Sequence, residues 1–298
     1  MSDTTLVIGA GPVGTAVTDE LIKRGREVFV LTRSGTAVRG ARSLAGSAAD
    51  PRDLQAAFDT SGANRVIDCM HAPYDAAVWR STLIPAEKTV LGLAAEREIH
   101  VTFPESVYAF GERANTVTAT SEVEATTGKP GIRAQLLIAR THANTPVCSV
   151  VASDLYGPGC GRTAVAHALI VEPLQRATRT MALIDSSALH PFTYLPDYAR
   201  ALVGASQNQL TGITITPTAD SVCQREFAER AAYAGKLRAH TPLELKKWML
   251  QFAGLFNRDI HGLVEMTWLW DSPRFVQGTY DWAPTDLDEG LHRTFEAA

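Results

Sequence analysis

Short apolar runs and helix-spaced apolar residues alternate along the first half of the chain. The runs, rich in β-branched residues, predict buried strands at 4–8, 28–31, 66–69, 99–103 and 147–151, with a weaker one at 43–45. The helix-spaced sets predict helices over 12–24, from 51, over 75–98 and over 129–143. Asp50, directly before Pro51, is the expected N-cap of the second helix. Such alternation indicates a parallel sheet with helices on both faces.

The alternation loosens beyond Tyr156. Helical spacing returns near 162–178, 220–234 and 242–256. Trp268-Leu269-Trp270 alternates as a strand does. Aromatic residues gather towards the end of the chain, at Trp248, Phe252, Phe256, Trp268, Trp270, Phe275, Tyr280 and Trp282. The predicted fold class is α/β, a doubly wound parallel sheet with a smaller C-terminal lobe.

A glycine-rich turn joins the first predicted strand to the first predicted helix. Residues 9–14 read Gly9-Ala10-Gly11-Pro12-Val13-Gly14, the G-x-G-x-x-G pattern in a strand–turn–helix context. Gly9 allows the tight turn, Gly11 lets the backbone approach a pyrophosphate, and Gly14 allows close packing of helix and strand. Free N–H groups at the helix N-terminus, from Val13 onwards, attract phosphate. The turn therefore predicts a dinucleotide site that includes Pro12 and Val13. The predicted sheet is then Rossmann-type, with a smaller C-terminal substrate lobe. Residues 1–157 would form the dinucleotide-binding domain, with 190–205 returning to it, and 158–298 mainly the substrate-binding lobe.

The end of the second predicted strand bears on the choice of dinucleotide. An NAD site places an Asp or Glu there to bind the ribose hydroxyls. This chain has Leu31-Thr32-Arg33-Ser34-Gly35 instead. Arg33 could stack on adenine and pair with a 2′-phosphate, and Ser34 could donate to the same group. A merely solvated Arg33 is the alternative. The sequence favours NADP(H) over NAD.

Composition narrows the class of protein. The 298 residues carry 28 Lys and Arg against 32 Asp and Glu, a formal net charge of −4, which argues against a general nucleic-acid binder. No apolar run approaches the ~20 residues of a membrane span, and no Lys/Arg run suggests a membrane surface. Four scattered cysteines form no zinc-spaced set, so no metal is expected. A reduced, cytoplasmic protein is the expectation. Only six residues are lysines, so each can be considered singly.

Several further segments resemble the short-chain dehydrogenase/reductase superfamily, in the extended or atypical branch that includes the NAD-dependent epimerase/dehydratase family. Besides Gly9–Gly14, these are Ala49-Asp50, Ser106-Val107-Tyr108, Ser153–Gly159, His190–Ala199 and Ala283–Leu291. The resemblance covers nearly the whole chain. It implies that Asp50 contacts adenine and that the segment containing Tyr156 lies beside the nicotinamide.

The resemblance fails at the catalytic positions. The family uses a Ser or Thr and a Tyr-x-x-x-Lys pair, in which the Tyr is the acid or base and the Lys holds the ribose. At the matching positions this chain has Pro104, Lys129 and Arg133. Lys129 could donate a hydrogen bond or a proton to a carbonyl, and Arg133 could hold ribose or phosphate oxygens. An exposed Lys129 at the first turn of a helix is the alternative.

Other candidates leave the sheet at its ligand-binding edge. Tyr108 follows the fifth strand and Tyr156 the sixth, and each is either an acid or a packing aromatic. His71 follows the fourth strand and could contact the cofactor or shuttle a proton, although an ordinary loop histidine is commoner.

The predicted function is NADP(H)-dependent hydride transfer to or from a carbonyl, imine or activated alkene of a small, fairly apolar metabolite. The last part of the chain has few arginines for phosphate clamps: Arg258, Arg274 and Arg293 are the ones after position 240. A non-redox isomerase, cyclase or lyase stays open, as does a non-catalytic NADP-binding regulator, because the standard residues are replaced. A homodimer also stays open as a partner.

Overall fold

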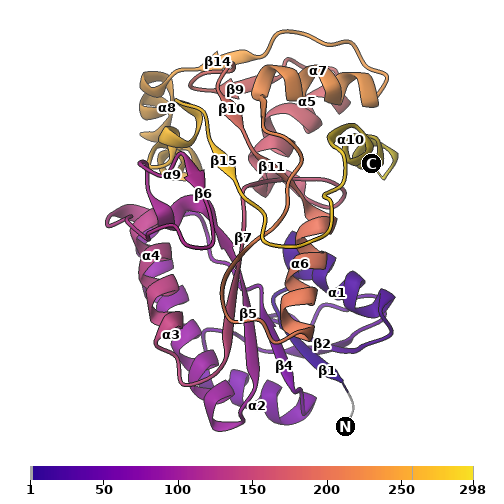
Figure 1. The fold of residues 1–298 in the computed structure, drawn as a ribbon, viewed down its shortest axis with the longest axis vertical. Helices are drawn as coiled ribbons and strands as arrows, with labels where there is room; N and C mark the ends of the chain where they lie inside the picture. Colours follow the sequence, from indigo (N-terminus) through magenta and orange to yellow (C-terminus); the bar gives the residue numbers. More distant parts are fainter. Residues whose placement is uncertain (1–2, 257, 298) are drawn as a thin grey trace.

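The computed structural model describes residues 3–256 and 258–297, without the side chains of 258 and 259. Its centre is a seven-stranded sheet in the order β12-β7-β5-β4-β1-β2-β3 (Figure 1). Every neighbouring pair in this sheet is parallel. The strands are β1 (Thr4–Ile8), β2 (Glu27–Thr32), β3 (Arg42–Ala45), β4 (Arg65–Asp68), β5 (His100–Ser106), β7 (Val147–Ala152) and β12 (Gly212–Ile215). The predicted doubly wound Rossmann sheet is confirmed.

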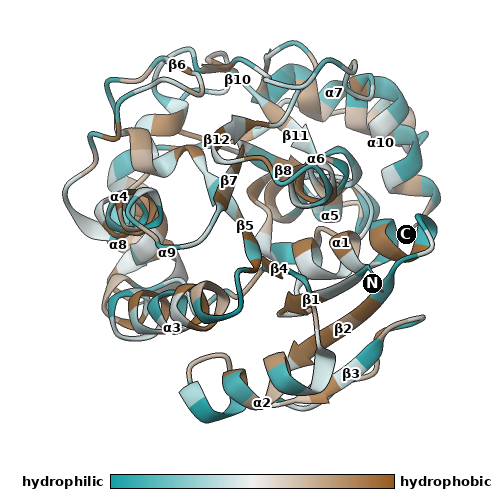
Figure 2. Cartoon of the chain, turned by 60° about the horizontal axis from the view of Figure 1, so that its bottom comes forward, coloured by the Kyte–Doolittle hydropathy of each residue, from teal (hydrophilic) through white to brown (hydrophobic). Residues whose placement is uncertain are grey.

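Helices cover both faces of this sheet (Figure 2). They are α1 (Pro12–Lys23), α2 (Pro51–Ser61), α3 (Ala76–Glu96), α4 (Gly128–Thr141) and α6 (Leu195–Gln207). Successive side chains of strand β1 point to opposite faces of the sheet. Leu6 and Ile8 pack with α2 and α3 on one face, and Val7 packs with α1 and α6 on the other. Because α6 packs against α1, the chain returns to the sheet after an excursion of about 40 residues.

Capping side chains mark the first residues of helices α2 and α3. Asp50 caps α2 by accepting a hydrogen bond from the backbone N of Arg52, as predicted. Asp75 accepts from the backbone N of Ala77 and Val78 and caps α3, which continues through Pro85. Cys69 and Cys148 are buried in the core, as expected of small apolar side chains. Strand β12 was not predicted, and it pairs with β7 at the sheet edge.

The second lobe is built from short elements above the carboxyl ends of the strands (Figure 1). Its strands are β6 (Thr116–Val117), β8 (Asp154–Tyr156), β9 (Met181–Leu183), β10 (Leu189–His190), β11 (Phe192–Tyr194), β13 (Val222–Cys223), β14 (Leu243–Leu245) and β15 (Phe275–Val276). Its α-helices are α5 (Glu172–Gln175), α7 (Gln224–Ala234), α8 (Lys247–Gly254), α9 (Arg258–Val264) and α10 (Leu287–Glu296). The described residues also contain one π-helix (His167–Val171) and three 3₁₀ turns, at Val107–Phe110, Gly161–Thr163 and Thr267–Trp270.

The helical stretch expected near 162–178 is confirmed in the main: a 3₁₀ turn at Gly161–Thr163 is followed by a helical run over 165–175, which consists of the π-helix and α5 with one turn before them. Two other predictions for this lobe need correction. The stretch 242–256 begins as β14, because Leu243–Leu245 pairs with Met181–Leu183, and becomes helical only from Lys247. Trp268–Trp270 lies in a 3₁₀ turn, with Trp270 buried and Trp268 half-buried. Period-2 spacing over three residues is too short to distinguish a strand from a turn.

Candidate functional site

The glycine turn has the shape that a pyrophosphate requires. Gly9 adopts φ +92°, in the left-handed region, and the N-terminus of α1 follows at Pro12 with Gly11 as its N-cap. A Cβ at Gly14 would collide with the carbonyl oxygen of Gly9, so helix and strand approach as closely as predicted. A Cβ at Gly11, in contrast, would meet nothing within 4 Å. The open side of the turn therefore lies at Gly11, where a phosphate would sit against the helix N-terminus.

The turn after β2 presents the residues expected to select the dinucleotide. Arg33 and Ser34 are both exposed there. Ser34 Oγ lies 2.5 Å from Thr36 Oγ1, and the backbone N of Thr36 donates to Thr32 Oγ1 over 3.1 Å. This turn therefore gathers hydroxyl groups beside a guanidinium. The family resemblance implies that Asp50 contacts adenine. In the structure its carboxylate caps α2, the helix that follows the edge strand β3.

The ends of β5 and β7 place Tyr108 and Asp154 side by side. Ser106 is the register partner of Ala152, and Tyr108 and Asp154 each follow two residues later. The pKa of the Tyr108 phenol is raised far above its usual value. Burial is the largest cause, and the nearby Asp154 carboxylate is the second. Tyr108 therefore remains protonated at neutral pH and can donate a hydrogen bond.

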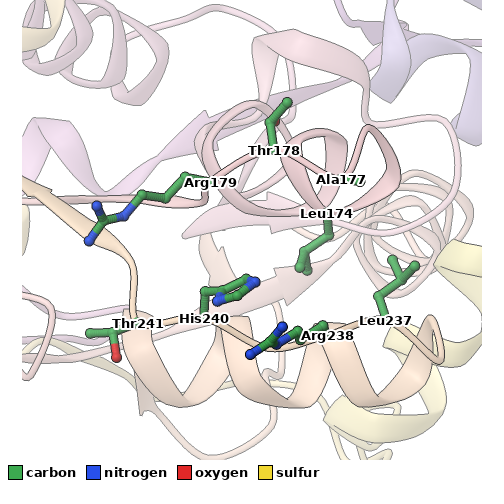
Figure 3. A pocket seen from close by; sticks show the side chains of 8 residues that line it. All are labelled: Leu174, Ala177, Thr178, Arg179, Leu237, Arg238, His240 and Thr241. Atoms are coloured by element: carbon green, nitrogen blue, oxygen red, sulfur yellow. The ribbon is translucent and has the colours of Figure 1, made fainter.

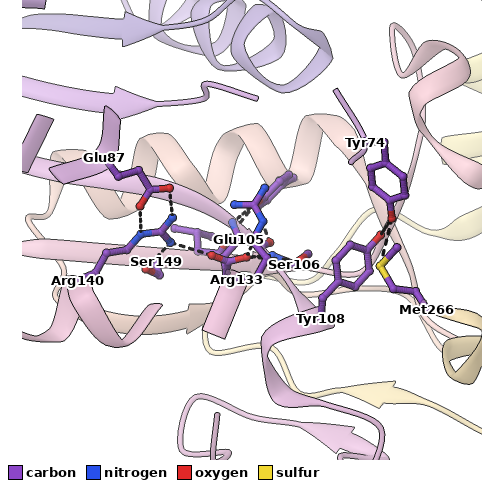
Figure 4. A network of polar contacts seen from close by, with 11 residues as sticks. Tyr74, Glu87, Glu105, Ser106, Tyr108, Arg133, Arg140, Ser149 and Met266 are labelled. Carbon is purple, nitrogen blue, oxygen red and sulfur yellow. Dashed lines mark hydrogen bonds and ion pairs between the residues drawn. The ribbon is translucent and has the colours of Figure 1, made fainter. Parts of the chain in front are cut away.

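Tyr74, from the segment after β4, completes this edge. Its hydroxyl oxygen lies 3.5 Å from the Tyr108 hydroxyl and 3.1 Å from Met266 Sδ (Figure 4). On the other side, Asp154 Oδ2 lies 2.9 Å from Nε2 of the buried His190, whose Nδ1 is 3.2 Å from the Leu269 carbonyl oxygen. Two phenols, a carboxylate and an imidazole thus meet where the sheet edge faces the second lobe.

Lys129, predicted as either catalytic or exposed, is fully buried. Its Nζ donates to the Gly262 carbonyl oxygen over 2.7 Å and to Glu265 Oε2 over 3.0 Å, and it lies 4.6 Å from the ring centroid of Tyr74. The same Glu265 oxygen accepts the backbone N–H of Lys129 over 2.9 Å. The exposed alternative is therefore wrong. The ammonium group is bound to α9 and the residue after it, and it connects the two lobes.

Arg133 stands one turn further along α4 and is nearly buried. Its Nε is 3.6 Å from Glu105 Oε1, and its guanidinium lies over the Trp79 ring at 4.9 Å (Figure 4). That Nε has no hydrogen-bond partner among the described residues. Glu105 is therefore the charged group that faces this buried Nε, at ion-pair distance.

Behind Arg133 lies a buried ionic network. Arg140 binds Glu87 through two nitrogens, at 2.9 and 2.7 Å, and Glu105 Oε2 at 2.9 Å (Figure 4). Asp68, at the end of β4, has its pKa raised to about 7, first by burial and then by Glu87. The network fixes α3, α4 and β5 against each other under the candidate site.

The remaining predicted residues lie in different surroundings. Tyr156 is buried in the second lobe, 5.5 Å from Phe227 and 5.4 Å from Tyr194 between ring centroids, and it packs there as an aromatic. His71 lies after β4, with its Nδ1 2.5 Å from the Ala72 carbonyl oxygen and its ring edge-on to Trp79. Burial, and then Arg133, lower the pKa of His71 to about 4, so the ring is neutral at pH 7.

Sequence reasoning missed Tyr74, Asp154, His190 and Glu265. Tyr74 and Asp154 each follow a predicted strand at its ligand edge, the signal that singled out Tyr108 and His71. Glu265 had no such signal, because it lies 136 residues from its partner Lys129. The described part of the chain contains no group of three or more His, Cys, Asp or Glu residues that could hold a metal ion, and no helix in it is long and apolar enough to span a membrane.

These features define a Rossmann-type dinucleotide-binding protein. The family model of the NAD dependent epimerase/dehydratase family matches residues 5–215. The chain therefore belongs to this family of NAD-dependent epimerases and dehydratases. A search of curated proteins gives no match.

Solved structures share the fold at low sequence identity. The Bordetella bronchiseptica enzyme WbmH in complex with NAD+ has a TM-score of 0.79 at 14% identity, covering 100% of this chain and 98% of that chain. The dTDP-glucose 4,6-dehydratase of Bacillus anthracis, in complex with NAD, has a TM-score of 0.79 at 11% identity, covering 99% and 96%. The UDP-glucose 4-epimerase of Thermotoga maritima, with UDP-glucose, has a TM-score of 0.75 at 18% identity, covering 99% and 98%.

Proposed function

We propose that this enzyme is an NADP(H)-dependent oxidoreductase acting on a small, uncharged carbonyl, imine or activated alkene, with Tyr108 as the proton donor. One observation carries the proposal: the Tyr108 hydroxyl lies beside Tyr74 and Asp154 at the ligand edge of the sheet, whereas Lys129 is held by Glu265. The bound cofactor would supply or accept the hydride.

The chain's own residues would divide the remaining work. The Gly9–Gly14 turn, with Pro12 and Val13, would bind the pyrophosphate, and Arg33 with Ser34 would bind the 2′-phosphate that distinguishes NADP from NAD. Arg133 would hold ribose oxygens. Tyr108, kept protonated by burial and by Asp154, would donate its proton to the oxygen or nitrogen that becomes basic during reduction.

The same geometry assigns lesser roles to two earlier candidates. Lys129 would join the lobes through Glu265, and Tyr156 would pack the second lobe. We also propose that residues 1–157, with the returning segment, form the cofactor domain and that residues 158–298 mainly shape the substrate pocket.

The charge around the site favours a small, uncharged substrate. Arg140 is occupied by Glu87 and Glu105, and Arg274 donates to the carbonyl oxygens of Glu112, Ala114 and Trp268. Asp154 adds a carboxylate, which would repel a diphosphate. The side chain of Arg258 lies outside the described residues. A nucleotide sugar, as in the Thermotoga maritima complex, is the alternative substrate class, favoured by the shared family.

The test is a turnover panel with the whole protein. We expect oxidation of NADPH, followed at the nicotinamide absorbance, with a subset of small aldehydes, ketones, imines or enones. Tyr108→Phe should abolish this turnover while leaving NADPH binding intact. Conversion of UDP-glucose or dTDP-glucose without net NADPH oxidation would contradict the proposal and favour an epimerase or dehydratase. NADPH binding without turnover of either panel would favour a regulator.

A further inference from the structure

Helix α8 and the turn that follows it expose four large apolar side chains to solvent. Trp248 is 68% exposed, Phe252 65%, Leu255 74% and Phe256 82%. Trp248, Phe252 and Leu255–Phe256 follow one another at helical spacing and so share a face. Phe252 and Phe256 are in ring contact, with centroids 5.7 Å apart. Single exposed apolar residues are ordinary, but four large ones within nine positions are typical of an interaction surface.

The chain around this helix is basic, although the whole protein is acidic. Residues 236–256 contain Lys236, Arg238, Lys246 and Lys247 against the single carboxylate of Glu244, in a chain of net charge −4. Glu244 pairs with Lys246 and accepts from Ser186. Lys236, Arg238 and Lys247 are exposed. Three of the six lysines of the chain therefore lie in this segment.

A cavity of about 570 Å³ opens at the same end of the lobe. Arg238 and His240 line it from the connection between α7 and β14, and Thr178 and Arg179 line it from the connection between α5 and β9 (Figure 3). No carboxylate is among its lining residues in the described chain. Its floor includes Leu174. Two guanidinium groups, hydroxyl groups and an apolar floor suit an anionic headgroup with attached hydrocarbon.

The cavity and the apolar helix lie at one end of the molecule. The connection that lines the cavity runs directly into β14, which pairs with β9, and then into α8 (Figure 1). This end of the second lobe is opposite the N-terminus and away from the central sheet (Figure 1). A contact made there would leave the cofactor turn accessible.

Although no Lys/Arg run in the sequence suggested a membrane surface, we propose that residues 236–256, with the cavity at Arg179, are a docking surface for an anionic lipid bilayer. Exposed Trp, Phe and Leu side chains beside Lys and Arg are the composition of helices that lie in the membrane interface. Such binding is peripheral and uses the apolar face for insertion and the cations for anionic headgroups. It does not depend on the function proposed above.

Charge and shape favour a bilayer over two other partners for this surface, a second copy of the chain and an acidic protein. A two-fold contact between copies of the chain would place Lys247 and Arg238 against the same basic patch, with repulsion. An acidic protein would satisfy the cations, but four protruding side chains would need matching concavities on it. A bilayer accommodates them without a preformed shape.

The test measures binding of the full chain to vesicles by co-sedimentation. We expect binding to phosphatidylcholine vesicles that contain about 30% phosphatidylglycerol, little binding to pure phosphatidylcholine, and loss of binding as salt is raised. The double variant Trp248→Ser/Phe252→Ser should reduce binding to anionic vesicles at least about fivefold. Lys247→Glu/Arg238→Glu should reduce it comparably.

Matched controls come from the sheet half of the protein. Ile138, which is 48% exposed on α4, and Lys23, exposed on α1, lie outside the surface, so Ile138→Ser and Lys23→Glu should bind as the wild type does. Circular dichroism would confirm that each variant is folded. Absence of binding to anionic vesicles, or equal binding by the double serine variant, would overturn the proposal. A dimer in solution that the serine variant dissociates would overturn it in favour of a contact between copies.

Discussion

A single carboxylate oxygen of Glu265 binds Lys129 twice, at 3.0 Å from the ammonium nitrogen and at 2.9 Å from the backbone nitrogen. Glycines make this approach feasible. A Cβ at Gly128 would lie 2.6 Å from the same oxygen, and one at Gly262 would lie 3.1 Å from Lys129 Nζ. Lys129 stands at the position where the family has its catalytic tyrosine. In this chain it links α4 to the second lobe.

The first prediction concerns the ion pair between Lys129 and Glu265. Lys129→Met keeps most of the length of the side chain and removes its charge, leaving Glu265, which is 31% exposed, without its partner. We expect a loss of about 1–3 kcal/mol in the free energy of unfolding. Glu265→Gln should cost a similar amount, and the double variant less than the sum of the two. Urea denaturation measures all three, and additive losses would show that the pair does not interact.

The second prediction separates chemistry from stability at the phenol pair. Tyr108→Phe removes the proposed proton donor, and we expect kcat to fall by roughly 10²–10⁴ with little change in NADPH affinity. Tyr74→Phe removes only the hydroxyl 3.5 Å away, so its loss of kcat should be much smaller. Steady-state kinetics on a substrate found in the carbonyl panel would measure both. Equal kcat values for wild type and Tyr108→Phe would exclude Tyr108 as the donor.

Local patterns were sufficient to predict much of the fold. The strand–turn–helix at Gly9–Gly14, the cap at Asp50 and the continuous helix through Pro85 depend on neighbours within a few residues, and all three are present. Strand β12 could not be predicted in the same way. Its four residues acquire their place only by pairing with β7, more than 60 positions earlier.

The candidate site was predicted less completely, for a related reason. Tyr108 and Arg133 could be named because they stand at fixed offsets from strands and helices. Whether Lys129 faces a substrate depends on Glu265, which is distant in sequence and has no motif of its own. The second lobe was the least predictable region, because its short strands, such as β9 and β14, exist only as pairs of distant segments.

The third prediction tests the choice of dinucleotide. Arg33→Asp replaces a cation beside the proposed 2′-phosphate with a repelling carboxylate, the residue type typical of NAD sites. We expect the affinity for NADPH to fall about 100-fold relative to that for NADH, roughly the strength of a charge-assisted phosphate contact plus the new repulsion. Fluorescence titration with both cofactors measures the ratio. Arg52→Asp, an exposed arginine on α2, is the matched control and should leave the ratio nearer its wild-type value. An unchanged ratio in Arg33→Asp would remove Arg33 from cofactor selection.

The fourth prediction uses two glycines of one turn. Gly11→Ala adds a methyl group to open space, so the protein should fold with unchanged stability, yet the methyl group would stand where the phosphate approaches. We expect a loss of at least about tenfold in NADPH affinity. Gly14→Ala would collide with Gly9 and should lower stability as well. Thermal unfolding with and without NADPH distinguishes the two, and normal NADPH binding by Gly11→Ala would argue against a pyrophosphate at this turn.

The last prediction concerns the pH dependence of stability. Burial and Glu87 raise the pKa of Asp68 to about 7, from about 3.9 in an unfolded chain. Between these values the unfolded chain loses the proton before the folded protein does, so Asp68 lowers stability progressively from about pH 4 to about pH 7 and by a constant amount above that. Asp68→Asn keeps the oxygen that accepts from the backbone N of Met70. We expect the free energy of unfolding of this variant, relative to wild type, to rise by roughly 2–4 kcal/mol between pH 4.5 and pH 8. Urea denaturation at both pH values measures this difference. A difference that stays the same at the two pH values would show that Asp68 is ionised throughout and paired with Arg140 and Arg133.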